Sequence, residues 1–149
     1  MPAATARPLD HVVFVYGTLT EREHVSTVLE SCPFEYCGNA TLHGLSRVDG
    51  EYPTLVPGGR TTGRLLAIDR TGLDALDAYE GVDRGLYVRV AVDVSHPDVA
   101  SDEGWCYVGD PDRLDAPGGW PGSGAFDTRV RAYLADASVI IGPEATSPN

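Results

Sequence analysis

The most regular alternation of hydrophobic and polar residues lies between Leu86 and Val94. Valine recurs there at every second position, at 88, 90, 92 and 94, with more polar residues between. Because successive side chains of a strand point to opposite faces, this pattern predicts a strand with one buried face. Further short strands are predicted at residues 63–68 and 104–108.

A second strong signal is the apolar run over residues 12–16, in which three of the first four residues are β-branched. This run predicts a buried strand. Gly17 ends it, because glycine allows backbone angles that other residues resist. Thr18 and Thr20 are candidate N-caps of a helix predicted over residues 21–29.

The chain between these two strands is predicted to be extended over residues 34–48. Gly38 and Gly44 indicate bends or β-bulges within it. Asp49-Gly50 is a hairpin-turn signal. Residues 52–59 contain two prolines and two glycines, so they predict a loop or a short edge strand followed by a turn.

Two more helices are predicted. One runs from about residue 73 to 80 and stops at Gly81, and the other runs from about 128 to 137 with Asp127 as its cap. Residues 109–125 are rich in Gly, Pro and Asp, which predicts a long loop. Residues 1–10 and about 140–149 are expected to be tails.

The order of these elements favours one fold class. Strands outnumber helices and are joined by hairpin-like turns. The prediction is therefore an α+β domain spanning residues 1–149, with a small, mostly antiparallel β-barrel or mixed sheet and two or three flanking helices.

Charge narrows the classes of partner. The chain of 149 residues has a net charge of −11, and all eleven basic residues are arginine. Nucleic acids and anionic membranes select basic surfaces, so neither is an expected partner. No apolar run is long enough to span a bilayer. The first ten residues lack the apolar core of a signal peptide, so we expect a cytoplasmic location.

The cysteines and histidines form no recognisable metal-binding pattern. The three cysteines have neither CxxC nor mixed Cys/His spacing, and the four histidines are scattered along the chain. We expect no metal and no cofactor. The cysteines are Cys32, Cys37 and Cys106, and the histidines are His11, His24, His43 and His96.

The turn at Gly17 is the first candidate site. A strand, a glycine turn and a helix N-terminus direct the backbone N–H groups of Gly17, Thr18 and Leu19 toward one place. This arrangement suits a small anion such as a carboxylate or a phosphate. The alternative is an ordinary connection between a strand and a helix.

Glu80 is the second candidate. At about 100° per residue it projects about 20° from Leu73, within the apolar sector of its helix. Burial and the helix C-terminus would both raise the pKa of this carboxyl group, which suits a general acid/base. The alternatives are that Glu80 pairs with Arg84 or Arg89, or that it reaches water.

Two motifs resemble the γ-glutamylcyclotransferase-like (AIG2-like) family. The first is Tyr16-Gly17-Thr18-Leu19 after the N-terminal strand. The second is Leu76-Asp77-Ala78-Tyr79-Glu80-Gly81, followed by Tyr87-Val88-Arg89-Val90 at the start of a valine-rich strand. The resemblance runs from about Val12 to Val108.

The resemblance implies an enzyme that releases 5-oxoproline from a γ-glutamyl amino acid or a γ-glutamyl amine. The α-amine of the substrate attacks its own γ-carbonyl carbon, and no cofactor is needed. Glu80 would be the general acid/base. The substrate would be bound by Tyr16, Gly17, Thr18, Leu19 and Tyr87, in a monomer or homodimer.

Several alternatives remain open at this stage. The protein could be a non-catalytic AIG2-like module that binds a small carboxylate. A nucleotide enzyme is disfavoured, because the chain has no lysine and no P-loop or Rossmann glycine pattern. Tyr16 could pack in the core, Tyr87 and Arg89 could form a solvent-side pair, and Tyr52 is a weaker pocket candidate that could anchor a turn.

The acidic composition generates a testable hypothesis about salt. Self-repulsion of a chain with a net charge of −11 is weakest where salt screens it, so we expect a high-salt cytoplasm. The melting temperature should rise between about 0.1 and about 3 M KCl. Thermal melts measure this, and a melting temperature independent of salt would count against the hypothesis.

Overall fold

The computed structural model describes residues 9–30, 32–97, 99, 102–137 and 139–143. They form six strands, three α-helices and two short 3₁₀ helices. In chain order these are β1 (His11–Val15), η2 (Thr18–Thr20), α1 (Arg22–Leu29), β2 (Phe34–Val48), β3 (Thr54–Ile68), α2 (Arg70–Glu80), η3 (Val82–Arg84), β4 (Tyr87–Val94), β5 (Glu103–Gly109), α3 (Phe126–Asp136) and β6 (Ile140–Pro143).

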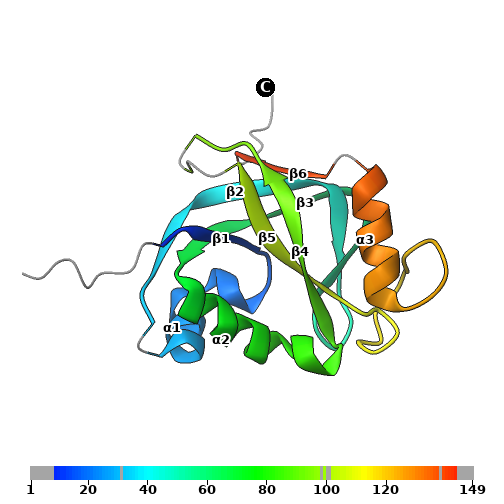
Figure 1. The fold of residues 1–149 in the computed structure, drawn as a ribbon, viewed down its shortest axis with the longest axis horizontal. Coiled ribbons are helices and arrows are strands. Elements are labelled where there is room, and N and C mark those ends of the chain that lie inside the picture. The colour runs from blue at the N-terminus through cyan, green and yellow to red at the C-terminus, as the bar shows by residue number, and fades with distance from the viewer. Residues whose placement is uncertain (1–8, 31, 98, 100–101, 138, 144–149) are drawn as a thin grey trace, which may run out of the picture.

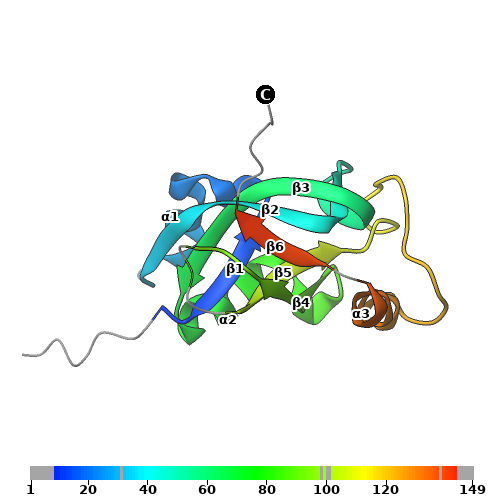
Figure 2. The same ribbon diagram turned by 90° about the horizontal axis from the view of Figure 1, so that it is seen from above.

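The six strands close into a barrel in the order β1-β3-β2-β6-β4-β5 (Figures 1 and 2). Four of the pairings are antiparallel, and the β1–β5 and β4–β6 pairings are parallel. The predicted α+β class, a small and mostly antiparallel barrel with flanking helices, is confirmed. Closure gives every described strand a partner on each side, although β6 pairs with only part of β2 and part of β4.

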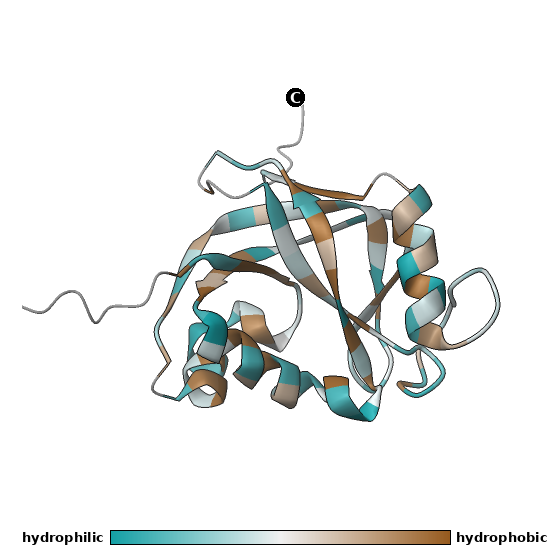
Figure 3. Ribbon diagram, in the orientation of Figure 1, coloured by the Kyte–Doolittle hydropathy of each residue, from teal (hydrophilic) through white to brown (hydrophobic). Residues whose placement is uncertain are grey.

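The helices lie at two separate places around the barrel. α1 and α2 contact each other, and both views show them away from α3, which packs against β4 (Figures 1 and 2). Hydrophobic residues are spread along the barrel strands (Figure 3). None of the helices in the described part of the chain is long and apolar enough to cross a membrane.

Buried side chains form two clusters, and β1 contributes to both. Val12 and Phe14 belong to the cluster that includes the four alternating valines of β4. Val13 and Val15 belong to the second cluster, which includes buried residues of α1 and α2. The continuous apolar run of β1 is explained by this burial on both faces, and the predicted single buried face of β4 is confirmed.

The long β2–β3 hairpin has two irregularities where glycines were predicted to bend the chain. Its register shifts between Tyr36 and Gly38 and again between His43 and Leu45. Gly38 and Gly44 have φ values of 138° and 106°, which other residues rarely adopt. The predicted β-bulges are confirmed.

The prediction for residues 52–59 is wrong in part. Residues from Thr54 onward do not form a separate loop and turn but belong to one strand that continues to Ile68. Gly58 and Gly59, with φ values of 95° and 73°, lie opposite the bulge at Gly44. The two irregularities match, so the strands stay paired across them.

The predicted C-terminal tail is also wrong for its first residues. Ile140–Pro143 form β6, which pairs antiparallel with β2 and parallel with β4. This strand has four residues and ends in Gly-Pro, so neither its length nor its composition indicates a strand. The predicted tail residues 1–8 and 144–149 lie outside the described residues.

Helix starts differ from the predicted caps. The N-cap of α1 is Glu21, and the hydroxyl group of Thr20 instead donates a hydrogen bond to the carbonyl oxygen of Gly17 at 2.7 Å. The N-cap of α3 is Ala125, so Asp127 lies within the helix. A short 3₁₀ helix after Gly17 takes up the residues that were expected to cap α1.

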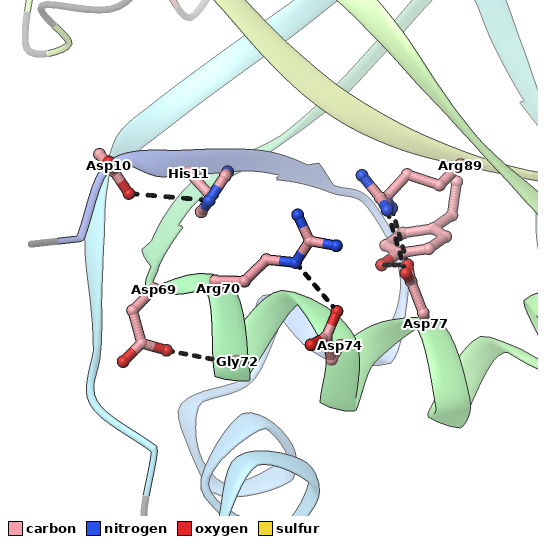
Figure 4. Close-up of polar contacts among 9 residues, drawn as sticks. Asp10, His11, Asp69, Arg70, Gly72, Asp74, Asp77 and Arg89 are labelled. Carbon is pink, nitrogen blue, oxygen red and sulfur yellow. Dashed lines mark hydrogen bonds and ion pairs between the residues drawn. The ribbon is translucent and has the colours of Figure 1, made fainter. Parts of the chain in front are cut away.

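Helix α2 starts three residues earlier than predicted, at Arg70, and ends at Glu80 as predicted. The Asp69 carboxylate accepts a hydrogen bond from the backbone N–H of Gly72 at 2.8 Å, which caps the helix (Figure 4). Gly81 has the left-handed conformation, with a φ of 70°, and stops the helix as predicted. The two caps fix the position of Glu80 in the last turn.

The predicted loop after β5 is present, and three of its residues, Pro111, Leu114 and Trp120, are buried. Leu114 is 1% exposed and Trp120 is 5% exposed. The indole N–H of Trp120 donates a hydrogen bond to the carbonyl oxygen of Leu55 at 3.1 Å. The hydrogen bond of Trp120 attaches the loop to β3.

Gly63 is the position where a side chain is least tolerable. A Cβ atom there would collide with the backbone oxygen of Val15 and the ring of Phe14. Gly63→Ala should therefore lower the free energy of unfolding by about 1–3 kcal/mol. Gly119 has no atom within 4 Å of its Cβ position, so Gly119→Ala is the matched control. Urea unfolding measures both variants, and equal stability would contradict the prediction.

Candidate functional site

A cavity of about 320 Å³ lies between the turn after β1, the two neighbouring helices α1 and α2, and the ends of β4 and β5. Its volume is at the lower end of the range for ligand pockets. The lining residues are Phe14, Val15, Tyr16, Gly17, Leu19, His24, Tyr52, Pro53, Tyr79, Glu80, Arg84, Leu86, Tyr87 and Tyr107.

The residues that line this cavity differ in their solvent exposure. One group of lining residues is buried, another is exposed, and Glu80 belongs to the half-buried residues between them. The buried residues are Phe14, Val15, Tyr16, Leu19, Tyr87 and Tyr107, and the exposed residues are His24, Tyr52, Tyr79 and Arg84.

The turn at Gly17 is held by hydrogen bonds to its carbonyl oxygens. The Arg47 guanidinium group donates to the oxygen of Tyr16 at 2.7 Å, and the Tyr36 hydroxyl group donates to that of Leu19 at 2.7 Å. In a planar trans peptide the N–H group points opposite to the C=O group. The bond from Arg47 therefore directs the N–H of Gly17 away from Arg47.

Glu80 has no hydrogen bond or ion pair with any residue that the structure describes. Burial raises the pKa of its carboxyl group from 4.5 to about 7, because a poorly hydrated site disfavours the charged form. The alternative that Glu80 pairs with Arg89 is wrong, since Arg89 binds Asp77. Arg84 lines the same cavity without forming an ion pair with Glu80.

Asp77, three residues before Glu80 in α2, is paired, in contrast to Glu80 (Figure 4). Arg89 donates to its two oxygens at 2.8 and 3.1 Å, and the Tyr107 hydroxyl group donates at 2.6 Å. The Arg89 guanidinium group also lies 4.3 Å from the ring centre of Trp105. Arg89 therefore forms its aromatic pair with Trp105, and together with Asp77 it holds the Tyr107 side chain, which lines the cavity.

The buried tyrosines act as hydrogen-bond donors. Tyr16 donates to the carbonyl oxygen of Tyr107 at 2.6 Å, and Tyr87 donates to that of Pro53 at 2.6 Å. Burial raises the pKa of both phenols, and the nearby Glu80 adds to the effect. Both side chains therefore stay protonated at neutral pH. Tyr16 belongs to a core cluster and also lines the cavity.

The structure brings together most of the residues predicted from the sequence. Five of them line one cavity: Tyr16, Gly17, Leu19, Glu80 and Tyr87. The side chain of Thr18 lies outside the described part of the chain. Tyr52, the weaker candidate, is 55% exposed and also lines the cavity.

Several lining residues were not predicted as part of the site. His24 comes from α1, and its ring nitrogen Nε2 lies 3.0 Å from the hydroxyl oxygen of Tyr79 on α2. Tyr107 comes from β5. Their presence depends on how α1 and β5 pack against α2, for which the sequence carries no local signal. Arg84 was considered only as an ion-pair partner of Glu80, not as a residue that lines the same cavity.

No group of three or more His, Cys, Asp or Glu side chains within the described ranges could hold a metal ion. Glu80 is the carboxylate that lines the cavity, and His24 is the histidine. The arrangement offers one carboxyl group with a pKa near neutrality, protonated phenols and a glycine turn. These groups can transfer a proton and bind an anion.

The family model described as gamma-glutamyl cyclotransferase, AIG2-like, matches residues 13–123. The resemblance inferred from the two motifs is therefore confirmed. No curated protein gave a match.

Solved structures share the fold. One is a γ-glutamyl cyclotransferase with 20% sequence identity and a TM-score of 0.54, aligned over 66% of this chain and 65% of that one. Another is from Arabidopsis thaliana, with 29% identity and a TM-score of 0.52 over 83% and 82% of the two chains. A third is an uncharacterized protein from Homo sapiens, with 18% identity and a TM-score of 0.58 over 93% and 92%.

These likenesses show that the predicted γ-glutamylcyclotransferase-like fold is present. This chain spans about 65% of the length of the γ-glutamyl cyclotransferase that it matches.

The unpaired carboxyl group should make stability depend on pH. Burial raises the pKa of Glu80 to about 7, so the folded chain keeps a proton that the unfolded chain loses above about 4.5. The free energy of unfolding should fall as pH rises between these two values and then level off. Glu80→Gln should be more stable than the wild type at about pH 8, by on the order of 1–3 kcal/mol.

Urea unfolding over a series of pH values measures this difference, which should shrink toward acidic pH. Glu35→Gln is the matched control, because Glu35 is exposed and lies outside the cavity. A pH trend of equal size in both variants would contradict the assignment to Glu80.

Proposed function

Because this chain belongs to the gamma-glutamyl cyclotransferase, AIG2-like family, we propose that it releases 5-oxoproline from a γ-glutamyl amino acid or a γ-glutamyl amine. The observation that carries the proposal is the position of Glu80. It is an unpaired, half-buried carboxyl group with a pKa of about 7, in the same cavity as the glycine turn.

The reaction needs few parts. The α-nitrogen of the substrate forms a bond to its own γ-carbonyl carbon, and the bond from that carbon to the leaving nitrogen breaks. Two protons leave the α-ammonium group, because the ring nitrogen of 5-oxoproline keeps only one hydrogen, and both end on the leaving nitrogen, which departs as an ammonium group, so atoms and charge balance. The attack is intramolecular, so holding the substrate in a curled conformation supplies much of the rate advantage.

Glu80 is the group proposed to move the protons. With a pKa of about 7, its carboxylate and carboxylic acid forms are both populated at neutral pH, so it can accept each proton in turn from the α-nitrogen and pass it to the leaving nitrogen. A positioned general acid/base contributes about 10²- to 10⁴-fold to the rate. The neighbouring Asp77 is unsuited to this role, because Arg89 and Tyr107 occupy its oxygens.

The turn of Tyr16, Gly17, Thr18 and Leu19 is proposed to bind negative charge. The bond from Arg47 fixes the peptide between Tyr16 and Gly17 before substrate arrives. A preorganised N–H group can stabilise the oxyanion that forms on the γ-carbonyl, or the α-carboxylate. Tyr87 lines the cavity beside them. No step requires a metal or a cofactor.

The Glu80→Gln variant tests the proposal. The wild type should produce 5-oxoproline from at least one member of a panel of γ-glutamyl amino acids and γ-glutamyl amines. Glu80→Gln should lower kcat by about 10²- to 10⁴-fold, and Glu35→Gln should not change it. In the wild type kcat/KM should rise with pH through about 7, as Glu80 loses its proton.

Chromatographic quantification of 5-oxoproline measures the product. Full activity in Glu80→Gln would overturn the assignment of the base. Binding of a γ-glutamyl compound without product, in high as well as low salt, would instead favour the non-catalytic carboxylate-binding module.

A further inference from the structure

The exposed end of the cavity has an unusual composition. Tyr52 is 55% exposed and Tyr79 is 43% exposed, and both line the cavity. Among the described residues, the other large hydrophobic side chain classed as exposed is Ile140. Exposed aromatic surface at the mouth of a pocket points to a binding role.

Arg84 adds a positive charge to this end. It lines the cavity, is exposed, and its guanidinium group makes no hydrogen bond or ion pair with the described residues. Its atom Nη2 lies 2.8 Å from the position of a Cβ atom on Gly81, so the group packs over that glycine. The backbone oxygen of Arg84 accepts a hydrogen bond from Arg113 at 2.7 Å, which holds the segment in place.

Arg84 does not use its charge in an ion pair with Glu80. The two residues are four apart, yet no ion pair joins them, and burial is the cause of the raised pKa of Glu80. Four other arginines are paired with carboxylates, among them Arg47 with Asp49 and Arg89 with Asp77. Arg84 is therefore available to an anionic group of a ligand in the cavity.

The lining of the cavity offers a place for each of the two parts of a substrate. The glycine turn, the buried tyrosines and the half-buried Glu80 line the same cavity as the exposed residues Tyr52, Tyr79 and Arg84. With the γ-glutamyl group at the turn and its γ-carbonyl beside Glu80, the leaving amine extends to the exposed end.

We propose that Tyr52, Tyr79 and Arg84 form a subsite for the leaving amine, and that this subsite selects γ-glutamyl derivatives of aromatic amino acids. The inference rests on the proposed function. The guanidinium group binds the carboxylate of the leaving amino acid, and the two tyrosine rings contact its aromatic side chain. The products are 5-oxoproline and the free aromatic amino acid.

Four substrates separate the two features of the leaving group. They are γ-glutamyl-phenylalanine, γ-glutamyl-alanine, γ-glutamyl-phenethylamine and γ-glutamyl-ethylamine. The phenethylamine and ethylamine derivatives correspond to the phenylalanine and alanine derivatives without the carboxylate of the leaving group. We expect γ-glutamyl-phenylalanine to have the highest kcat/KM, about tenfold above γ-glutamyl-phenethylamine and about threefold to tenfold above γ-glutamyl-alanine.

Variants assign each preference to a side chain. Arg84→Gln should lower kcat/KM about tenfold for the two substrates with a carboxylate on the leaving group, and leave the other two unchanged. Tyr52→Ala should lower it about threefold for the two aromatic substrates, and Tyr52→Phe should restore it. Arg60→Gln is the matched control, because Arg60 is exposed and outside the cavity.

A uniform loss on all four substrates in Arg84→Gln would mean that Arg84 binds the α-carboxylate of the glutamyl group, and would overturn the proposal. Equal kcat/KM for all four substrates in the wild type would overturn it as well.

Binding without chemistry separates this inference from the proposed function. N-acetyl-γ-glutamyl-phenylalanine and N-acetyl-γ-glutamyl-phenethylamine cannot cyclise, because their amines are blocked. Calorimetry should show tighter binding of the phenylalanine compound, and Arg84→Gln should abolish the difference. This binding result supports the subsite even if the enzyme assay detects no 5-oxoproline. Absence of 5-oxoproline would count against the proposed function and not against the subsite. Equal binding of the two compounds overturns the subsite.

Discussion

The site depends on the burial of β1 on both of its faces. Val12 and Phe14 pack into one cluster of core residues, and Val13 and Val15 pack into the other, with α1 and α2. Because the same strand joins both clusters, the turn that follows it has a fixed position relative to α2. The second cluster also buries Leu73 and Leu76, the residues that attach α2. The proximity of the glycine turn and Glu80 is thus a result of core packing.

The contrast between Asp77 and Glu80 shows how the fold keeps one carboxyl group free. Both lie near the end of α2, but Asp77 accepts hydrogen bonds from Arg89 and Tyr107. Glu80 has no such partner among the described residues, and its poor hydration raises the pKa of its carboxyl group, so it gains a proton more readily. Binding to Asp77 also occupies the guanidinium group of Arg89. The free carboxyl group costs stability, which is typical of functional residues.

Local pattern was enough to predict the parts of the molecule that depend on periodicity. The alternating valines of β4 and the angle of Glu80 around α2 follow from the geometry of a strand and a helix. The strand at Ile140–Pro143 was missed, because its four residues become a strand only by pairing with β2 and β4. The continuous strand through Gly58 and Gly59 was missed for a related reason. The irregularity at these two glycines is matched by the bulge at Gly44 on the paired strand β2, which cannot be seen from either segment alone. Likewise, contacts between distant segments bring His24 and Tyr107 to the cavity.

Because the chain is strongly acidic, the positive charge of Arg84 matters more for binding an anionic substrate than one arginine usually does. A γ-glutamyl amino acid carries two carboxylates and one ammonium group, so a chain with a net charge of −11 repels it at long range. That repulsion is screened over about 10 Å at 0.1 M salt, whereas a contact within the cavity is screened much less. The unpaired guanidinium group of Arg84 at the cavity mouth attracts a carboxylate of the substrate at short range, while salt screens the repulsion from distant carboxylates. High salt would weaken the repulsion further and leave close contacts with Arg84 and the tyrosine rings to decide which ligand binds.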